Sequence, residues 1–305
     1  MHGWRCRQRP DACITSSAMS RIVLSRTTQA DCDPRAGTVF FVGTATVLFR
    51  LGGYTILTDP NFLHQGDHVH LGYGLVAKRL TEPALEIDQL PPLDLVVLSH
   101  YHGDHFDRIA EQRLDRAVPI ITTRHAADKL GQAGFQAPHA LRPWESVAIT
   151  KPGAMPLTIT AMPGQHGPSA VSWLLPPVMG SLLEFGDAPP FRLFISGDTL
   201  IHEEFRKIPE RVRGIDLALL HLGGTRILGV YVTMDAAQGV EALRILDPEA
   251  AIPIHYNDYS VFKSPLEDFQ RAVRAAGLDN RVHYLRHGET FQFRLAGEGR
   301  LGRAS

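Results

Sequence analysis

The feature that most constrains this chain is an apolar stretch that ends in a cluster of histidines and aspartates. Residues 95–107 read LVVLSHYHGDHFD. The apolar run at 95–98 is typical of a buried strand, yet His100, His102, Asp104 and His105 follow it within a few positions. Protonated imidazoles this close would repel one another. A metal ion bound at the end of a strand is the arrangement that makes such crowding favourable.

Length and charge set the class of protein. A chain of 305 residues with 44% hydrophobic residues can bury a large core. The 31 basic and 32 acidic residues nearly cancel, so no basic excess indicates a nucleic-acid partner. No apolar run has transmembrane length. We expect residues 1–35 to be a poorly ordered lead-in and residues 36–305 to form a single metallo-hydrolase domain.

The N-terminal segment and the cysteines bear on localisation. Residues 1–23 carry charge but no continuous apolar core of a secretory signal. The three cysteines, Cys6, Cys13 and Cys32, all precede the expected domain. An odd number argues against a disulfide framework. We therefore expect a cytoplasmic protein.

Short strands and scattered helices follow one another along the chain. We expect strands where β-branched or aromatic residues are bounded by turn residues, and these are residues 38–49, 54–58, 95–99, 118–122, 157–162, 171–175, 181–185, 191–196, 215–221 and 251–255. We expect helices at 106–114, 124–132, 234–246 and 264–276. Thr233 is the expected cap of the third helix, and Ser264 that of the fourth, with Pro265 at its first position. This pattern predicts a four-layer αββα sandwich with two sheets inside and helices outside.

The spacing of the cluster favours two metal positions. His100 and His102 are two residues apart, so their side chains point to one side of an extended backbone. Asp104 and His105 lie at the turn that begins a helix and can point elsewhere. Further ligands are expected where other apolar strands end, and the candidates are His166, Asp198 and His255. Imidazole and carboxylate are ligands that zinc accepts.

These seven residues, in this order, resemble the metallo-β-lactamase superfamily, and the resemblance extends from Gly43 to His255. The stretch GTATVLFRLGGYTILTDPNF before the cluster resembles the branch of ascorbate-6-phosphate lactonases and N-acyl-phosphatidylethanolamine phospholipase D-like proteins. Flavodiiron oxygen reductases of this fold carry a glutamate where His102 stands, so their chemistry is not expected.

The resemblance implies a ligand set for two divalent ions. His100, His102 and His166 would hold one ion, Asp104, His105 and His255 the other, and Asp198 would bridge them. Zinc is the default, with manganese or iron as alternatives because His and Asp suit several metals. A hydroxide between the metals would attack the substrate. Asp104 is in addition a candidate for carrying a proton to the leaving group.

Other residues are candidates for supporting roles. The resemblance favours Asp59 as the acceptor of a ligand histidine's N–H, against a plain turn residue before proline. His221 could donate a proton to the substrate, or it could be a core histidine. The candidates for substrate contact are His64, Trp173, Arg226 and Tyr231. For His64 and Trp173 a surface loop and core packing, respectively, are the competing interpretations.

The sequence therefore predicts a dinuclear metal-dependent hydrolase. The expected substrate is a small molecule with an ester, lactone or related acyl bond. The first alternative is a phosphodiesterase, including the phospholipase D-like kind, and a non-catalytic metal-bound binding protein is the alternative of another class. No nucleic-acid partner is expected. The sequence leaves open membrane contact and association into homo-oligomers.

Overall fold

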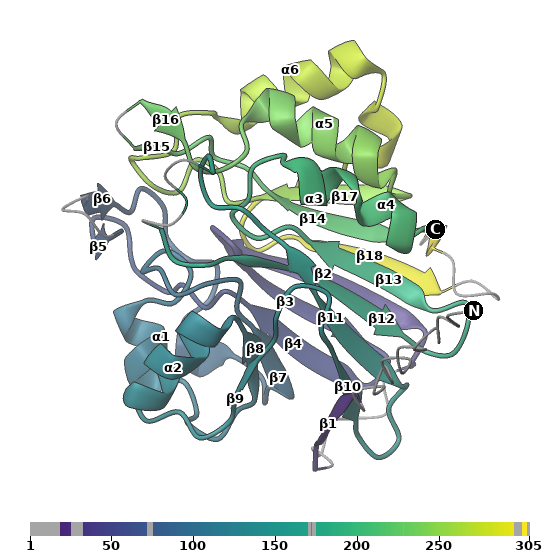
Figure 1. Cartoon of the computed structure of the whole chain (residues 1–305). Coiled ribbons are helices and arrows are strands. Elements are labelled where there is room, and N and C mark those ends of the chain that lie inside the picture. The colour runs from purple at the N-terminus through teal and green to yellow at the C-terminus, as the bar shows by residue number, and fades with distance from the viewer. Residues whose placement is uncertain are drawn as a thin grey trace, which may run out of the picture.

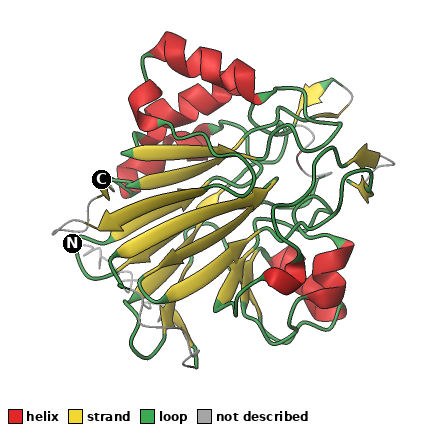
Figure 2. Cartoon of the chain, turned by 180° about the vertical axis from the view of Figure 1, so that it is seen from behind, coloured by secondary structure: helices red, strands yellow, loops and turns green. Residues whose placement is uncertain are grey.

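The computed structural model describes residues 19–25, 33–71, 76–169, 172, 175–227, 229–295 and 301–303. Two large β-sheets pack face to face, and helices cover the outer face of each (Figures 1 and 2). The predicted αββα sandwich is confirmed. Among the described residues, no helix is both long and apolar enough to cross a membrane.

The first sheet has eight strands and carries the histidine cluster. In spatial order it contains β19 (Leu301–Arg303), β18 (Thr290–Leu295), β2 (Ala36–Gly43), β3 (Thr46–Leu51), β4 (Tyr54–Thr58), β7 (Leu95–Val97), β8 (Ile120–Thr122) and β9 (Pro138–Ala140). The prediction of a single strand at 38–49 was wrong, because the chain reverses between Gly43 and Thr46 and forms two strands. Gly43 has φ 144° and Thr44 has φ 51°, so the extended backbone is interrupted there.

The second sheet has seven strands. Its order is β1 (Ser20–Val23), β10 (Ser146–Thr150), β11 (Leu157–Pro163), β12 (Met179–Phe185), β13 (Phe191–Ile195), β14 (Leu217–His221) and β17 (Ala250–Ile254). Strand β1 falls inside the segment predicted to be a poorly ordered lead-in. For these four residues that prediction was wrong, since they pair in parallel with β10. Residues 1–18 and the three cysteines lie outside the described part of the chain, as does most of the strand predicted at 171–175.

Helices cover the two sheets from opposite sides. The helices are α1 (Arg108–Arg113), α2 (Arg124–Gln132), α3 (Glu203–Arg206), α4 (Ile208–Arg211), α5 (Ala236–Leu246) and α6 (Leu266–Ala276). Figure 1 shows α1 and α2 beside β7 and β8, and α3 to α6 on the far side of the other sheet. Each helical layer shares a buried apolar cluster with its sheet, and a third cluster fills the space between the sheets.

Two helix starts differ from the sequence prediction by one or two residues. Helix α5 is capped by Asp235, which accepts from the N–H of Gln238, and not by Thr233. Helix α6 begins after Pro265, which has no side-chain cap. The Ser264 hydroxyl accepts instead from the backbone N–H of Ala236, at 3.0 Å. Ser264 therefore joins the starts of α5 and α6 and does not cap its own helix.

The parallel strands of both sheets end near one another. Strands β4, β7 and β8 are parallel, and so are β13, β14 and β17. Two short hairpins lie at this end of the sandwich (Figure 1). They are β5–β6 (His68–His70 and Val76–Lys78) and β15–β16 (Arg226–Ile227 and Val230–Tyr231). Side chains that follow these strand ends are thereby gathered in one place.

Candidate metal centre

The seven predicted ligands follow four strand ends. His100, His102, Asp104 and His105 come from the segment after β7. His166 follows β11, Asp198 follows β13 and His255 follows β17. The first segment belongs to the eight-stranded sheet and the other three positions belong to the seven-stranded sheet. The structure brings all seven side chains together where the two sheets meet.

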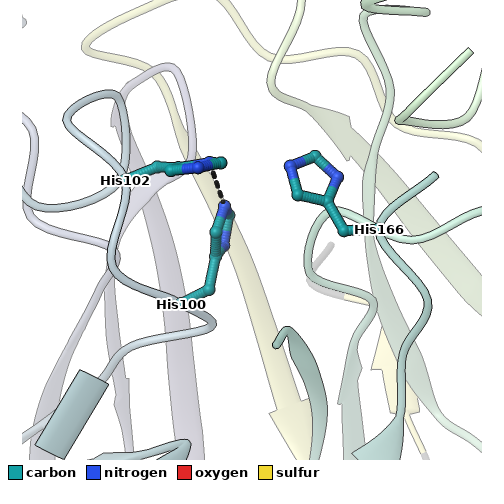
Figure 3. Close-up of side chains that lie close together, drawn as sticks. All are labelled: His100, His102 and His166. Atoms are coloured by element: carbon teal, nitrogen blue, oxygen red, sulfur yellow. Dashed lines mark hydrogen bonds between the residues drawn. The ribbon is translucent and has the colours of Figure 1, made fainter. Parts of the chain in front are cut away.

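Three histidines form the first group. The ring atoms of His100, His102 and His166 that could bind a metal lie within 4.8 Å of one another. Figure 3 shows the rings facing a common space, with His100 and His102 rising from one side and His166 from the other. His100 Nε2 lies 3.0 Å from His102 Nδ1. His100 and His166 are buried, whereas His102 is half-buried and forms the outer edge of the group.

Two carboxylates and two histidines form the second group. Asp104, His105, Asp198 and His255 are all buried, and their candidate ligand atoms also lie within 4.8 Å of one another. His105 Nε2 is 3.2 Å from Asp198 Oδ2. His255 Nε2 is 3.5 Å from Asp104 Oδ2, and Asp198 Oδ1 is 3.4 Å from His255 Nδ1. The ring centroids of His100 and His105, one from each group, are 4.2 Å apart.

The donor atoms of the second group fit a divalent cation. Asp104 Oδ1, His105 Nε2, Asp198 Oδ1 and His255 Nε2 are all buried, and none has a hydrogen-bond partner within the described residues. Buried polar atoms are nearly always paired, because leaving one unpaired costs free energy. Four such atoms converging on one point, with nitrogen and carboxylate oxygen donors, match the ligand types of zinc and similar ions.

The two groups differ in charge. Burial and the neighbouring imidazoles, chiefly His166, lower the pKa of His102 to about 3, so the three-histidine group is neutral and presents lone pairs. Burial also tends to lower the pKa of His105, but Asp198, Asp104 and Asp59 raise it well above its ordinary value. Carboxylates thus concentrate negative charge on the second group, where a cation would replace the protons.

Several ligand rings are held from behind. His166 Nδ1 donates to the Val232 carbonyl at 2.8 Å, and His105 Nδ1 lies 3.0 Å from Asp59 Oδ2. Asp59 also accepts from the Ser99 backbone N–H at 2.7 Å. A hydrogen bond to one ring nitrogen fixes which nitrogen is free for a metal. Asp59 therefore has the position predicted for it, beneath a ligand histidine.

The position of His221 does not suit the predicted proton transfer to substrate. The residue is fully buried at the end of β14. Its Nε2 is 3.2 Å from Asp59 Oδ2 and its Nδ1 is 3.3 Å from Ser196 Oγ. Both ring nitrogens are thus engaged inside the protein. His221 supports Asp59, which in turn contacts His105.

The predicted substrate contacts fall in different places. His64 is on the surface, with Nδ1 2.9 Å from Glu82 and Nε2 3.5 Å from Glu86, so its imidazole is engaged by carboxylates there. Trp173 lies outside the described residues. Arg226 and Tyr231 belong to the β15–β16 hairpin, and the Arg226 guanidinium stacks 4.0 Å from the Tyr231 ring centroid. Val232, which follows this hairpin, is the residue that holds His166.

Known proteins are similar to this chain in sequence and fold. Residues 54–256 match the Beta-lactamase superfamily domain. A relative from Opitutus terrae, a UPF0173 metal-dependent hydrolase, is 30% identical over 272 residues, which cover 83% of this chain and 98% of that protein. The fold and the ligand cluster define a metal-dependent hydrolase. The chain belongs to the metallo-β-lactamase superfamily and, within it, to the UPF0173 metal-dependent hydrolase family.

Solved structures show the same fold at low sequence identity. An isothiocyanate hydrolase from Delia radicum gut bacteria superposes with a TM-score of 0.72 at 20% identity, over 84% of this chain and 99% of that one. Igni18, a metallo hydrolase from Ignicoccus hospitalis, superposes with a TM-score of 0.64 at 23% identity, over 86% and 100% of the two chains.

Proposed function

We propose that this enzyme uses two divalent metal ions to hydrolyse an ester, lactone or related acyl bond in a small molecule. The observation that carries the proposal is the pair of adjacent ligand groups. Asp198 supplies its carboxylate to the second group. Burial lowers the pKa of both His100 and His166 in the first group, and the negative charge of Asp198 opposes that lowering. In this proposal Asp198 would bridge two ions, with His100, His102 and His166 holding one and Asp104, His105 and His255 the other.

The protein's own groups have separable tasks in such a reaction. Bound divalent ions, zinc by default and manganese or iron as alternatives, would lower the pKa of a water molecule and polarise the scissile carbonyl. We assign Asp104 the further task of passing a proton to the leaving group. The burial of six of the seven ligands, all except His102, excludes bulk water from this exchange.

The hollow beside the ligands favours an uncharged substrate. A cavity of about 540 Å³ adjoins the loops that carry His166 and Asp198. Its described lining includes Glu203 and Glu204 but no lysine or arginine. Both glutamates pair with the single cation of Lys207, which leaves a net negative charge. An anionic phosphodiester would be repelled here, whereas a neutral lactone or ester would not.

Metal content and substrate preference test the proposal together. Elemental analysis of chelator-free wild type should give two metal ions per chain, and Asp198→Ala should lose metal. Asp187→Ala, which removes an exposed carboxylate from the β12–β13 turn, is the matched control and should retain it. Wild-type protein without stoichiometric metal would overturn the proposal of a metal-dependent reaction.

A small substrate panel then separates the reaction classes. It comprises a neutral lactone, a p-nitrophenyl ester, bis-(p-nitrophenyl) phosphate and benzyl isothiocyanate, the last because a structural relative is named for that substrate class. We expect lactone or ester hydrolysis to be fastest and to vanish in His102→Ala. Preference for the phosphodiester would instead establish the phosphodiesterase alternative. Two bound metals with no hydrolysis of any class would indicate a binding protein.

A further inference from the structure

Arg79 is a fully buried cation close to the metal centre. It follows strand β6, and its exposed fraction is 0%. Its Nη1 donates to Asn61 Oδ1 at 2.7 Å and to the Thr44 hydroxyl, and its Nε donates to the Thr81 carbonyl at 3.0 Å. Among the described residues no carboxylate lies within ion-pair distance of it. Burying a guanidinium without an ion pair costs free energy. We therefore ask which parts of the protein its hydrogen bonds hold in place.

One set of these hydrogen bonds leads to the loop between two predicted ligands. Asn61 Oδ1 accepts from Arg79 and also from the Tyr259 hydroxyl, at 3.1 Å. With its oxygen occupied by two donors, the amide must turn its Nδ2 the other way. That nitrogen donates to the carbonyl of Gly103 at 3.1 Å. Gly103 stands between His102 and Asp104, so Arg79 fixes this loop through Asn61.

The other set leads to His255. Thr44 and His255 both have left-handed backbone conformations, with φ of 51° and 61°. The His255 N–H donates to the Thr44 carbonyl at 2.6 Å, and the Thr44 N–H donates to Asp258 Oδ2 at 2.7 Å. Such conformations in residues other than glycine persist only where their surroundings impose them. The Arg79 contact with the Thr44 hydroxyl is part of that surrounding structure.

We propose that Arg79 is a positioning residue for the half of the centre formed by Asp104, His105 and His255. The inference rests on the proposed dinuclear function. Arg79 reaches the Asp104 loop through Asn61 and the His255 backbone through Thr44. Of the three-histidine group, it reaches only His102 at this range, through the same Gly103 contact. Two ligands of the second group, Asp104 and His255, depend on these contacts, against one ligand of the first. Loss of Arg79 therefore weakens the Asp104–His105–His255 position more than the three-histidine position.

Calorimetric titration of metal-free protein with zinc tests this selectivity. Wild type should bind two ions. In Arg79→Met we expect one site to weaken by about 10- to 100-fold, the usual range for losing a group that orients metal ligands, and the other to weaken less. Arg79→Lys retains the charge but not the planar fork that reaches both Asn61 and Thr44. It should restore only part of the affinity.

A second buried cation supplies the matched control. Lys151 lies at the opposite end of the sheets, with its Nζ 2.8 Å from Asp94. Lys151→Met should lower stability yet leave both zinc affinities unchanged. Equal loss of zinc affinity in Lys151→Met and Arg79→Met would overturn the inference, because general destabilisation would then explain both. If Arg79→Met does not fold, the same titration of Asn61→Ala tests the inference. This variant loses the hydrogen bond to the Gly103 carbonyl but keeps the guanidinium.

The two proposals fail in distinguishable ways. A wild type that binds a single zinc ion overturns the dinuclear function, and the inference with it. A wild type that binds two ions, with unchanged affinities in Arg79→Met or Asn61→Ala, overturns the inference alone. Weakening of both sites to the same extent in these variants also contradicts it, because the contacts of Arg79 lead to two ligands of one half and to only one of the other.

Discussion

His221 and Asp59 are joined inside the protein, with His221 Nε2 3.2 Å from Asp59 Oδ2. The same oxygen atom lies 3.0 Å from His105 Nδ1. One carboxylate therefore serves two buried imidazoles, one of which is a predicted metal ligand. Burial alone would raise the pKa of Asp59, but His105 and His221 lower it to about 2. The group stays ionised and accepts from both rings.

Replacing His221 separates a supporting role from proton transfer to substrate. We expect His221→Leu to lower the free energy of unfolding by about 1–3 kcal/mol, because Asp59 and Ser196 lose a buried partner. The kcat of the preferred substrate should fall less than about tenfold. Urea unfolding and steady-state kinetics measure the two effects. A loss of kcat of about 100-fold or more at full metal content would restore the proton-donor role.

Asp59→Asn tests the carboxylate itself. The neutral amide has one acceptor oxygen where the carboxylate has two charged ones. It therefore cannot accept from both rings and from the Ser99 N–H, and His105 is held less firmly. Zinc affinity should fall by about 10- to 100-fold, as measured by competition with a chromophoric chelator. Asp187→Asn, an exposed substitution, should leave the affinity unchanged. Wild-type affinity in Asp59→Asn would show that the hydrogen bond to His105 is dispensable.

Gly103 is required by close packing beneath the ligand loop. A Cβ at this position would lie 2.2 Å from Val69 Cγ2 in the β5–β6 hairpin, so either the hairpin or the loop must move. We expect Gly103→Ala to lower metal occupancy and activity together. Gly131→Ala in α2 is the control, since a Cβ there meets nothing within 4 Å. That control should be neutral or stabilise the protein by up to about 1 kcal/mol.

The lowered pKa of Asp258 predicts that the stability of the fold depends on pH. Burial tends to raise its pKa, but His287 and then Arg79 lower it below the ordinary value. A carboxyl group whose pKa is lower in the folded state stabilises the fold above its unfolded pKa of about 4. That contribution is lost as the pH falls towards the folded pKa.

Comparison of metal-free wild type with Asp258→Asn isolates this effect. Urea unfolding between about pH 3 and pH 7 should show wild type losing more stability than the variant on the acid side of about pH 4. Metal-free protein is used so that proton competition at the ligands does not contribute. Parallel pH profiles for the two proteins would contradict the role of Asp258.

The ligand cluster could be predicted because its signal is local. His100, His102, Asp104 and His105 lie together after an apolar run, and His166, Asp198 and His255 each follow another strand. The ends of parallel strands meet in a layered α/β fold, so position along the chain was enough to predict that these residues gather. Asp59 was found by resemblance, and its place beneath His105 agrees with that interpretation.

Other features depend on contacts that no local pattern encodes. Arg79 follows Lys78 at the end of the short strand β6. The sequence could not distinguish it from a surface cation, although tertiary contacts bury it completely. The hydroxyl of Ser264 serves α5 and not α6, because a nearby helix start competes for it. Strand β1 forms at the edge of a sheet by pairing with β10, which lies more than a hundred residues along the chain.

The division of the ligands between two sheets has a consequence for how the protein acquires activity. Neither sheet alone carries a full set, since residues 100–105 end one sheet while His166, Asp198 and His255 end the other. A bound ion would hold the two sheets together. It would stabilise the fold by mass action, because the ligands are assembled only in the folded protein. Each ligand group is complete only when both sheets are docked, so complete metal binding would report that the two sheets have come together.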